Sequence, residues 1–162
     1  MISSVRSEGD VATARRAGAH QVVVTGGLSA DQVVERIFAY APDGVDHIVE
    51  VAFHPNIAVD ERLLKLGGSI ATYATGDPTP TIPFWPLVFK NVRLFFLGSD
   101  DFPAAAKAAA ARALNETLED EWPGFEVEAR FPLESIAKAH ELVEEHRASG
   151  RVVVTLEDRG TT

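Results

Sequence analysis

AGAHQVVV at residues 17–24, GVDHIVEV at 44–51 and LGGSIATY at 66–73 are the three stretches that decide the fold. Each one passes through a glycine-containing turn into a short, mainly apolar run, and a helical pattern precedes it. Near-continuous apolar runs are typical of parallel strands that are buried on both faces. The sequence therefore predicts an α/β fold built around a parallel sheet.

Further strands and helices follow from the same patterns. We expect strands over residues 1–5, 21–25, 46–52, 69–75, 92–97, 125–130 and 151–156, and helices over 8–17, 30–41, 57–66, 101–118 and 134–146. Ser29 and Gln32 form a capping-box sequence for the second helix, Gly18 ends the first, and Gly67 with Gly68 is expected to end the third. Residues 76–86 contain four prolines, which predict a surface loop.

The composition is that of a single soluble domain and excludes several kinds of site. The 162 residues are 46% hydrophobic and 24% charged, with a net charge of −9 and no cysteine. We expect one domain over 1–156 and a polar tail over 157–162, with no membrane span and no nucleic-acid partner. No secretory leader pattern is present, so we expect a cytoplasmic protein. Because cysteine is absent and the histidines lack ligand spacing, no metal is expected.

The twelve glycines lack one informative spacing. No three of them form the G-x-G-x-x-G turn, which holds a pyrophosphate against the start of a helix in dinucleotide-binding folds. The predicted sheet therefore comes without the turn that opens such a site.

Five phrases, taken in order, carry a resemblance to a known family: AGAHQVVV, DGVDHIVEVA, LLKLGGSIATYATG, FKNVRLFFLGS and FPLESIAKAHELVEEHRASGRVVV. Together they resemble the nucleotide-binding half of the medium-chain dehydrogenase/reductase superfamily, in its zinc-independent quinone oxidoreductase branch, over residues 1–156. The resemblance implies an oxidoreductase that uses NADPH to reduce a quinone or enone. It also implies a GroES-like substrate domain that comes first in such enzymes.

The same resemblance implies a Rossmann-like parallel sheet with helices on both faces that lacks the first strand and the glycine-rich turn. In the strand order 3-2-1-4-5-6 the first strand is central, so strands two and four would face an unfilled slot. We expect a partner to resolve this: an N-terminal catalytic-domain polypeptide, or self-association into a homo-oligomer. The remaining alternative is a derived domain that closes the gap with residues 1–5.

Cofactor-binding residues are carried over from the family position by position. The expected strand over residues 1–5 corresponds to the second strand of the family's sheet. Ser3, Arg6 and Ser7 occupy the stretch that in the family reads the ribose and its 2′-phosphate. No acid ends this strand, which favours NADPH over NADH. This sequence departs from the family at Asp10, where quinone reductases often carry a lysine, and a carboxylate there would repel a phosphate. Without the resemblance, the same residues are simply solvated.

A second group aligns with backbone contacts to the cofactor. Ala74 and Gly76 follow one strand, Gly98 and Ser99 follow the next, and Arg151 occupies a basic position near the C-terminus. Small residues suit backbone recognition, although Arg151 is equally explained as a charge beside an edge strand. No catalytic residue is predicted, because a nicotinamide cofactor carries the hydride chemistry itself.

Other features favour packing over chemistry. Residues 50–54 end a strand where open α/β sheets bind ligands, but Phe53 and His54 are bulkier than the small residues usual there. We expect His140 to lie on the inner face of its helix as a packing residue that donates one hydrogen bond. The absence of a G-x-S-x-G turn argues against a hydrolase triad.

Two functions are therefore carried forward. The first is the nucleotide-binding portion of an NADPH-dependent quinone or enone oxidoreductase that needs an N-terminal substrate domain for activity. The alternative is a non-catalytic Rossmann-like association module or truncated remnant. A flavodoxin-like or methyltransferase-like domain shares the alternation of strands and helices but lacks its own motifs here.

Overall fold

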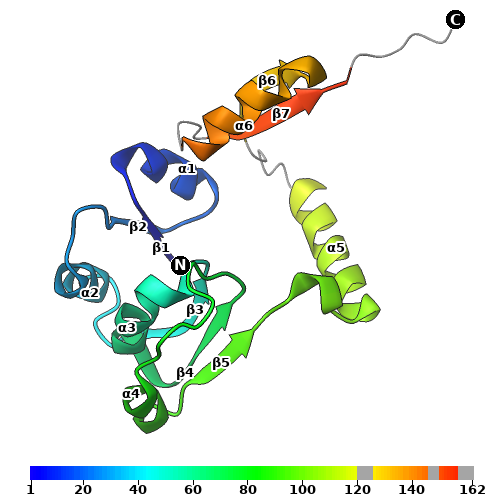
Figure 1. Ribbon diagram of the computed structural model, residues 1–162. Coiled ribbons are helices and arrows are strands. Elements are labelled where there is room, and N and C mark those ends of the chain that lie inside the picture. The colour runs from blue at the N-terminus through cyan, green and yellow to red at the C-terminus, as the bar shows by residue number, and fades with distance from the viewer. Residues whose placement is uncertain (120–125, 146–149, 157–162) are drawn as a thin grey trace, which may run out of the picture. The chain divides into compact units, whose positions relative to one another are not determined.

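The computed structural model describes residues 1–119, 126–145 and 150–156 of the chain (Figure 1). It divides the chain into two compact units, Met1–Ala111 and Arg112–Thr162, which are described separately below. Phe125 and His146, expected at the ends of a strand and a helix, and the expected tail over 157–162 lie outside the described residues.

The strands and helices alternate along the chain. The strands are β1 (Ile2–Val5), β2 (Gln21–Val24), β3 (Val45–Glu50), β4 (Leu64–Thr72), β5 (Arg93–Phe96), β6 (Val127–Pro132) and β7 (Arg151–Thr155). The α-helices are α1 (Val11–Arg16), α2 (Ala30–Phe38), α3 (Phe53–Leu63), α4 (Phe84–Phe89), α5 (Ala104–Glu119) and α6 (Ile136–Glu144). Short 3-10 helices cover η1 (Glu8–Asp10), η2 (Ser99–Asp101) and η3 (Leu133–Ser135).

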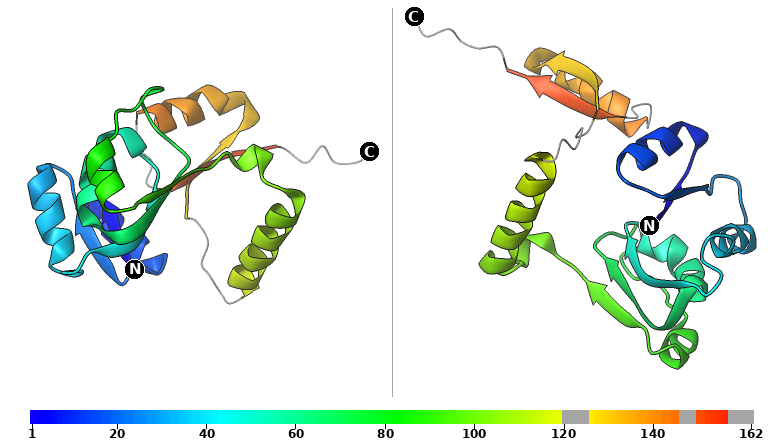
Figure 2. Two further views of the ribbon diagram at one scale, coloured as in Figure 1. Left: turned by 90° about the horizontal axis from the view of Figure 1, so that it is seen from below. Right: turned by 180° about the vertical axis from the view of Figure 1, so that it is seen from behind.

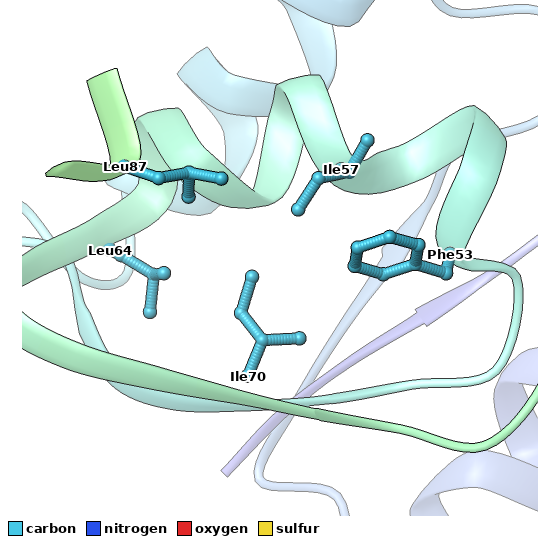
Figure 3. Close-up of a cluster of buried hydrophobic side chains, with 5 residues drawn as sticks. All are labelled: Phe53, Ile57, Leu64, Ile70 and Leu87. Carbon is cyan, nitrogen blue, oxygen red and sulfur yellow. The ribbon is translucent and has the colours of Figure 1, made fainter. Parts of the chain in front are cut away.

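A three-stranded parallel sheet in the order β3-β4-β5 forms the larger part of the first unit. Its buried core consists of Phe53 and Ile57 from α3, Leu64 and Ile70 from β4, and Leu87 from α4. Figure 3 shows Phe53 and Ile57 pointing from the helix toward Ile70. In Figure 1 and the right-hand view of Figure 2, α2, α3 and α4 lie on the same side of this sheet.

A separate parallel pair, β1 and β2, completes the sheet structure of the first unit. Val23 of β2 lies in a second apolar cluster with Val34 and Ile37 of α2 and Leu63 of α3. Ile2 of β1 packs against the same cluster, as do Val45 and Ile48 of β3. The two sheets thus share a core, yet no ladder joins β1 to β3 within the described ranges.

The second unit contains one β-α-β arrangement. β6 and β7 form a parallel pair, and α6 packs on both strands with Ala139 buried against them. Gly150 lets the chain pass close to β6, because a Cβ atom there would lie 2.6 Å from the carbonyl oxygen of Glu126.

Local sequence signals explain several element boundaries. The Ser29 hydroxyl accepts a hydrogen bond from the Gln32 N–H, and the Gln32 side chain accepts one from the Ser29 N–H, so the expected capping box is present. Gly18 follows α1 with a φ of 96°, the left-handed conformation that ends helices.

Three expectations are wrong. The third helix begins at Phe53 rather than at 57, and residues 64–66 belong to β4, where Gly67 adopts a φ of 74° inside the strand instead of stopping a helix. The loop expected over residues 76–86 ends earlier, because α4 already begins at Phe84. Pro86 lies within the first turn of this helix, a position where a helix tolerates proline. His140 is an exposed side chain rather than a packing residue, because Ala139 is the inward-facing residue of α6.

Candidate nucleotide-binding site at the carboxyl ends of the strands

The main candidate site is a pocket at the carboxyl ends of β4 and β5. It has a volume of about 530 Å³, within the range of small-ligand pockets. Its lining comes from the ends of both strands, the start of α3 and the proline-rich loop: Phe53, Thr72, Tyr73, Ala74, Thr75, Pro78, Pro80, Phe96 and Leu97. Open parallel sheets bind ligands outside the carboxyl ends of their strands, so the pocket lies where this fold places a cofactor.

Backbone hydrogen bonds fix the rim of this pocket. The Phe53 N–H donates to the Ala74 carbonyl at 3.1 Å, and the Leu97 N–H donates to the Thr72 carbonyl at 2.9 Å. These bonds tie α3 and the end of β5 to the end of β4. Phe53 and Phe96, which both line the pocket, make an edge-to-face contact with ring centroids 5.6 Å apart.

A contact between His54 and Asp77 and a turn stabilise the proline-rich loop beside the pocket. His54 Nδ1 lies 3.7 Å from Asp77 Oδ2, and both side chains are partly exposed. The other oxygen of Asp77 accepts a hydrogen bond from the Thr79 N–H at 2.8 Å, which closes an Asx-type turn. Of the two bulky residues noted at this strand end, Phe53 lines the pocket, whereas His54 is absent from the lining and lies beside Asp77 of the loop.

Two buried acids lie behind the turn between β3 and α3. The Glu50 carboxylate accepts hydrogen bonds from the Ala52 N–H and, at 3.2 Å to each oxygen, from the Asn56 side chain. Asp60, one turn further along α3, is also buried, and its Oδ2 has no hydrogen-bond partner among the described residues. Burial, together with the charge of Glu50 and a hydrogen bond to it, raises the pKa of Asp60 to about 8.

Sequence reasoning missed this acidic pair, although the sequence carried a signal for it. Asp60 falls on the inward helical face that also contains Phe53, Ile57 and Leu63, where an acid needs either a partner or a proton. The wrong start of the predicted helix hid that periodicity. At neutral pH the protonated Asp60 lets the pair occupy the site with one negative charge instead of two.

The residues expected to read the ribose phosphate lie within β1 and directly after it. Ser3 is half-buried in β1, and Arg6 and Ser7 are exposed immediately after it. Arg6 has no side-chain partner within the described part of the chain, so its charge is available to an anion. The hydroxyl of Ser7 is already engaged, because it donates a hydrogen bond of 2.7 Å to Asp10.

The remaining predicted residues fall into three groups. Ala74 lines the pocket, Gly76 lies two residues further along its loop, and Gly98 and Ser99 directly follow Leu97 on the opposite rim. Of these four positions, Ala74 alone belongs to the pocket lining, and the other three are its neighbours along the chain. Arg151 begins β7 in the second unit and is described only there.

Two kinds of feature are absent from the part of the chain that the structure describes. No group of three or more metal-ligating side chains is close enough together to hold a metal ion. No helix in the described ranges is both long enough and apolar enough to cross a membrane.

Comparison with known proteins relates this geometry to a family. The family model for zinc-binding dehydrogenases matches residues 17–154. A quinone oxidoreductase of Lama guanicoe is 30% identical over 118 residues, which is 70% of this chain and 34% of that protein. The chain thus spans about a third of the length of that relative.

Solved structures share the fold at low sequence identity. The mycobacterial protein Rv1454c, solved in complex with NADPH, is 21% identical with a TM-score of 0.77, covering 94% of this chain and 48% of that chain. A quinone oxidoreductase of Pseudomonas syringae pv. Tomato is 16% identical with a TM-score of 0.75, and the coverage is the same, 94% and 48%. These matches confirm the Rossmann-like α/β fold, and the family match confirms the resemblance seen in the sequence. The chain belongs to the zinc-binding dehydrogenase family.

Proposed function

We propose that this chain is the nucleotide-binding portion of an NADPH-dependent quinone or enone oxidoreductase, and that it needs an N-terminal substrate domain for activity. The observation that carries the proposal is the pocket at the carboxyl ends of β4 and β5 in a member of this family. Support comes from the quinone oxidoreductase of Lama guanicoe and from the NADPH complex of a structural neighbour. A cytoplasmic location stays a prediction.

The residues of the pocket fit the nicotinamide half of such a cofactor. Ala74 has a small side chain, and a Cβ atom added at Gly76 or Gly98 would meet no atom within 4 Å, so a planar group can approach the backbone there. The Ala74 carbonyl already accepts from the Phe53 N–H, so an amide ligand would use other backbone groups of the rim. When bound, NADPH supplies the hydride, and the chain supplies orientation and exclusion of water.

The phosphate half would be held by weaker features. Arg6 carries the free positive charge, and Ser3 and Ser7 lie beside it on and after β1, whereas Asp10 opposes an anion at the same place. Because the sequence also lacks the G-x-G-x-x-G turn, the isolated chain should bind NADPH weakly. We expect a dissociation constant on the order of 1 mM.

The donor set does not fit zinc, despite the name of the family. The chain contains no cysteine, and the described residues offer no cluster of metal-ligating side chains. We therefore assign no step to a metal and propose zinc-independent chemistry.

Exposed apolar surface favours one alternative, a non-catalytic association module. Val49 of β3 and Phe95 of β5 are 66% and 47% exposed on the sheet face opposite α3. A bare apolar sheet face is typical of a surface that another polypeptide covers. Under this alternative the chain would associate without binding nucleotide.

Isothermal titration calorimetry separates the two functions. NADPH and NADH are titrated into the folded chain up to several millimolar, and saturable binding that prefers NADPH is the expected result. If neither nucleotide binds at that concentration, the isolated chain is not a nucleotide-binding module. Native mass spectrometry of the same sample then shows whether it associates instead.

A further inference from the structure

Glu50 and Asp60 are two buried acids that interact without a balancing positive charge. Glu50, at the end of β3, is 7% exposed, and Asp60, two turns into α3, is 5% exposed. If both carboxylates were charged, they would repel each other and both would lack water, which is far costlier than burying one charge. The pair therefore holds one proton at neutral pH.

The other charged groups around this pair do not supply a counter-ion. The elements α2, β3 and β4 pack on α3. Their charged side chains, and those of α3 itself, have other partners or face solvent: Arg62 pairs with Asp31, Lys65 with Asp46 and Lys90 with Glu61, His47 bonds to Ser69, Arg36 bonds to the Val24 carbonyl, and Glu35 is exposed. In the described part of the chain no basic group pairs with either buried acid, so a proton balances the site instead of a salt bridge.

Hydrogen bonds decide which of the two acids holds the proton. The Glu50 carboxylate accepts from the Ala52 N–H and from the Asn56 side chain at the N-terminal end of α3, where the unpaired N–H groups of a helix stabilise a negative charge. Asp60 Oδ2, in contrast, has no partner among the described residues. Glu50 is therefore the ionised acid, and Asp60 is the protonated acid that hydrogen-bonds to it.

The turn that holds Glu50 also positions one wall of the pocket. Ala52 is the N-cap residue of α3 and Phe53 is its first residue, so the bond from Ala52 to Glu50 fixes the position at which the helix begins (Figure 3). Phe53 is 1% exposed, lines the pocket and contacts Phe96, and its N–H donates to the Ala74 carbonyl. A change of charge at the acid pair therefore reaches the pocket through adjacent residues of the backbone.

We propose that Asp60 is a positioning residue whose proton holds the start of α3, and with it Phe53, against the pocket, so that loss of this proton opens the rim between α3 and β4. When Asp60 releases its proton to solvent, repulsion replaces its hydrogen bond to Glu50. Hydration of both carboxylates then moves the first turns of α3 away from the sheet, and the Phe53 N–H loses the Ala74 carbonyl. The inference concerns the shape of the pocket and does not rest on the proposed function.

Amide hydrogen exchange of the full chain, without nucleotide, tests this role. The pKa of Asp60 is raised from 3.8 to about 8, so opening of the rim becomes easier as the pH rises through this range. Protection of the Phe53 N–H, corrected for the intrinsic exchange rate, should fall by about tenfold or more in total between pH 5 and 8 and level off above pH 8.

The Leu97 N–H, which bonds to the Thr72 carbonyl on the other rim of the pocket, is the internal control for this experiment. Its protection should stay within about twofold over the same pH range. An equal loss of protection at Leu97 and Phe53 would mean that ionisation destabilises the whole fold rather than one rim. That result would overturn the proposal.

Carbon-13 NMR of the side-chain carboxyl groups locates the proton in the parent chain. The Asp60 resonance should titrate near pH 8. An Asp60 resonance that titrates near its ordinary value of 3.8 would show that the acid is ionised at neutral pH, and would overturn the proposal without any variant.

Two variants separate the proton from side-chain packing. Asp60→Asn stays neutral and can still donate to Glu50, so protection of the Phe53 N–H should be as high as in the parent at pH 5 and should no longer depend on pH. Glu50→Gln keeps an acceptor for the Ala52 N–H but removes the charge, so protection should level off at a lower pH than in the parent. A pH dependence that persists in Asp60→Asn would reject the role of Asp60.

Two other titratable side chains beside the pocket supply matched controls. His54 follows Phe53 and lies 3.7 Å from Asp77, and Tyr73 belongs to the pocket lining. In His54→Gln and in Tyr73→Phe, the protection of the Phe53 N–H should depend on pH as it does in the parent. If either variant abolishes that dependence, the substituted group rather than Asp60 controls the rim, and the proposal is rejected.

Discussion

The hydroxyl of Ser7 donates a hydrogen bond of 2.7 Å to the carboxylate of Asp10, directly after β1. This bond places a negative charge next to Arg6, where the family resemblance predicts the ribose phosphate. The Asp10 N–H also donates a hydrogen bond of 3.2 Å to the Ser7 carbonyl, so both backbone and side chain join these two residues at the start of η1. Nucleotide selectivity at this end of the site should therefore depend on the balance of Arg6 and Asp10.

Replacing Asp10 with asparagine should strengthen NADPH binding. Asparagine can still accept the Ser7 hydrogen bond but removes the repulsion of the 2′-phosphate, so we expect about a two- to fivefold gain for NADPH and little change for NADH. Calorimetric titration of both nucleotides measures this ratio. Glu8→Gln, an exposed acid in the same helix, is the control, and an equal gain from it would mean that only net charge matters.

Filling the pocket should abolish binding without harming the fold. Ala74→Leu projects a larger side chain from the pocket lining, and we expect about a tenfold or greater loss of NADPH affinity. Ala58→Leu, at an exposed position on α3, is the matched control. Both variants should retain the parent melting temperature. Unchanged binding by Ala74→Leu would place the nucleotide elsewhere.

The buried Asp60 should make stability depend on pH. Its pKa is raised from 3.8 to about 8 on folding, so between these values the folded chain holds a proton that the unfolded chain has lost. The contribution of Asp60 to the free energy of unfolding is therefore greatest below about pH 4. It falls as the pH rises to about 8, by about 1.4 kcal/mol per pH unit at most.

Asp60→Asn should remove this dependence. The amide remains neutral and can donate a hydrogen bond to Glu50, so the variant should be more stable than the parent at pH 8. Chemical denaturation at pH 5, 6, 7 and 8 gives the difference between the two proteins at each pH. For Asp43→Asn, at an exposed turn position, the plot of unfolding free energy against pH should run parallel to that of the parent. Parallel curves for Asp60→Asn would show that Asp60 is ionised in the fold.

Alanine substitutions at two glycines should distinguish the cost of a left-handed backbone conformation from the cost of a steric clash. Gly44 and Gly67 both have positive φ angles, but a Cβ atom at Gly44 would lie 2.6 Å from the Leu63 carbonyl oxygen, whereas one at Gly67 meets nothing within 4 Å. Gly67→Ala should cost about 1–2 kcal/mol for the conformation alone. Gly44→Ala should cost about 2–4 kcal/mol, because the clash is added. Urea denaturation measures both free energies of unfolding, and equal costs would contradict the role of the contact.

Local signals in the sequence were enough for much of this fold. The capping box at Ser29 and Gln32 and the stop at Gly18 depend on neighbouring residues only, so they could be predicted from spacing. A pocket at the strand ends, with Ala74 in its lining, was also predictable, because ligands of parallel sheets bind at the carboxyl ends of the strands.

The features that the sequence did not predict depend on contacts between segments far apart in the chain. Gly67 and Gly68 read as a helix stop, but pairing of β4 with β3 extends the strand through them, with a register shift between Val45 and His47. The raised pKa of Asp60 could not be predicted from the sequence, because it depends on burial of this side chain and on the nearby Glu50. Both follow only from the position of α3 in the fold. Propensity is local, and tertiary pairing overrides it at such positions.

The open edges of β1 and β3 also bear on how the protein must be handled. Unpaired edges beside bare apolar residues promote sheet-to-sheet aggregation, and the net charge of −9 opposes it by repulsion between molecules at neutral pH. Near the isoelectric point of about 5.0 that repulsion vanishes. Purification and storage conditions, rather than thermal stability, should therefore set the concentration at which this chain stays monodisperse.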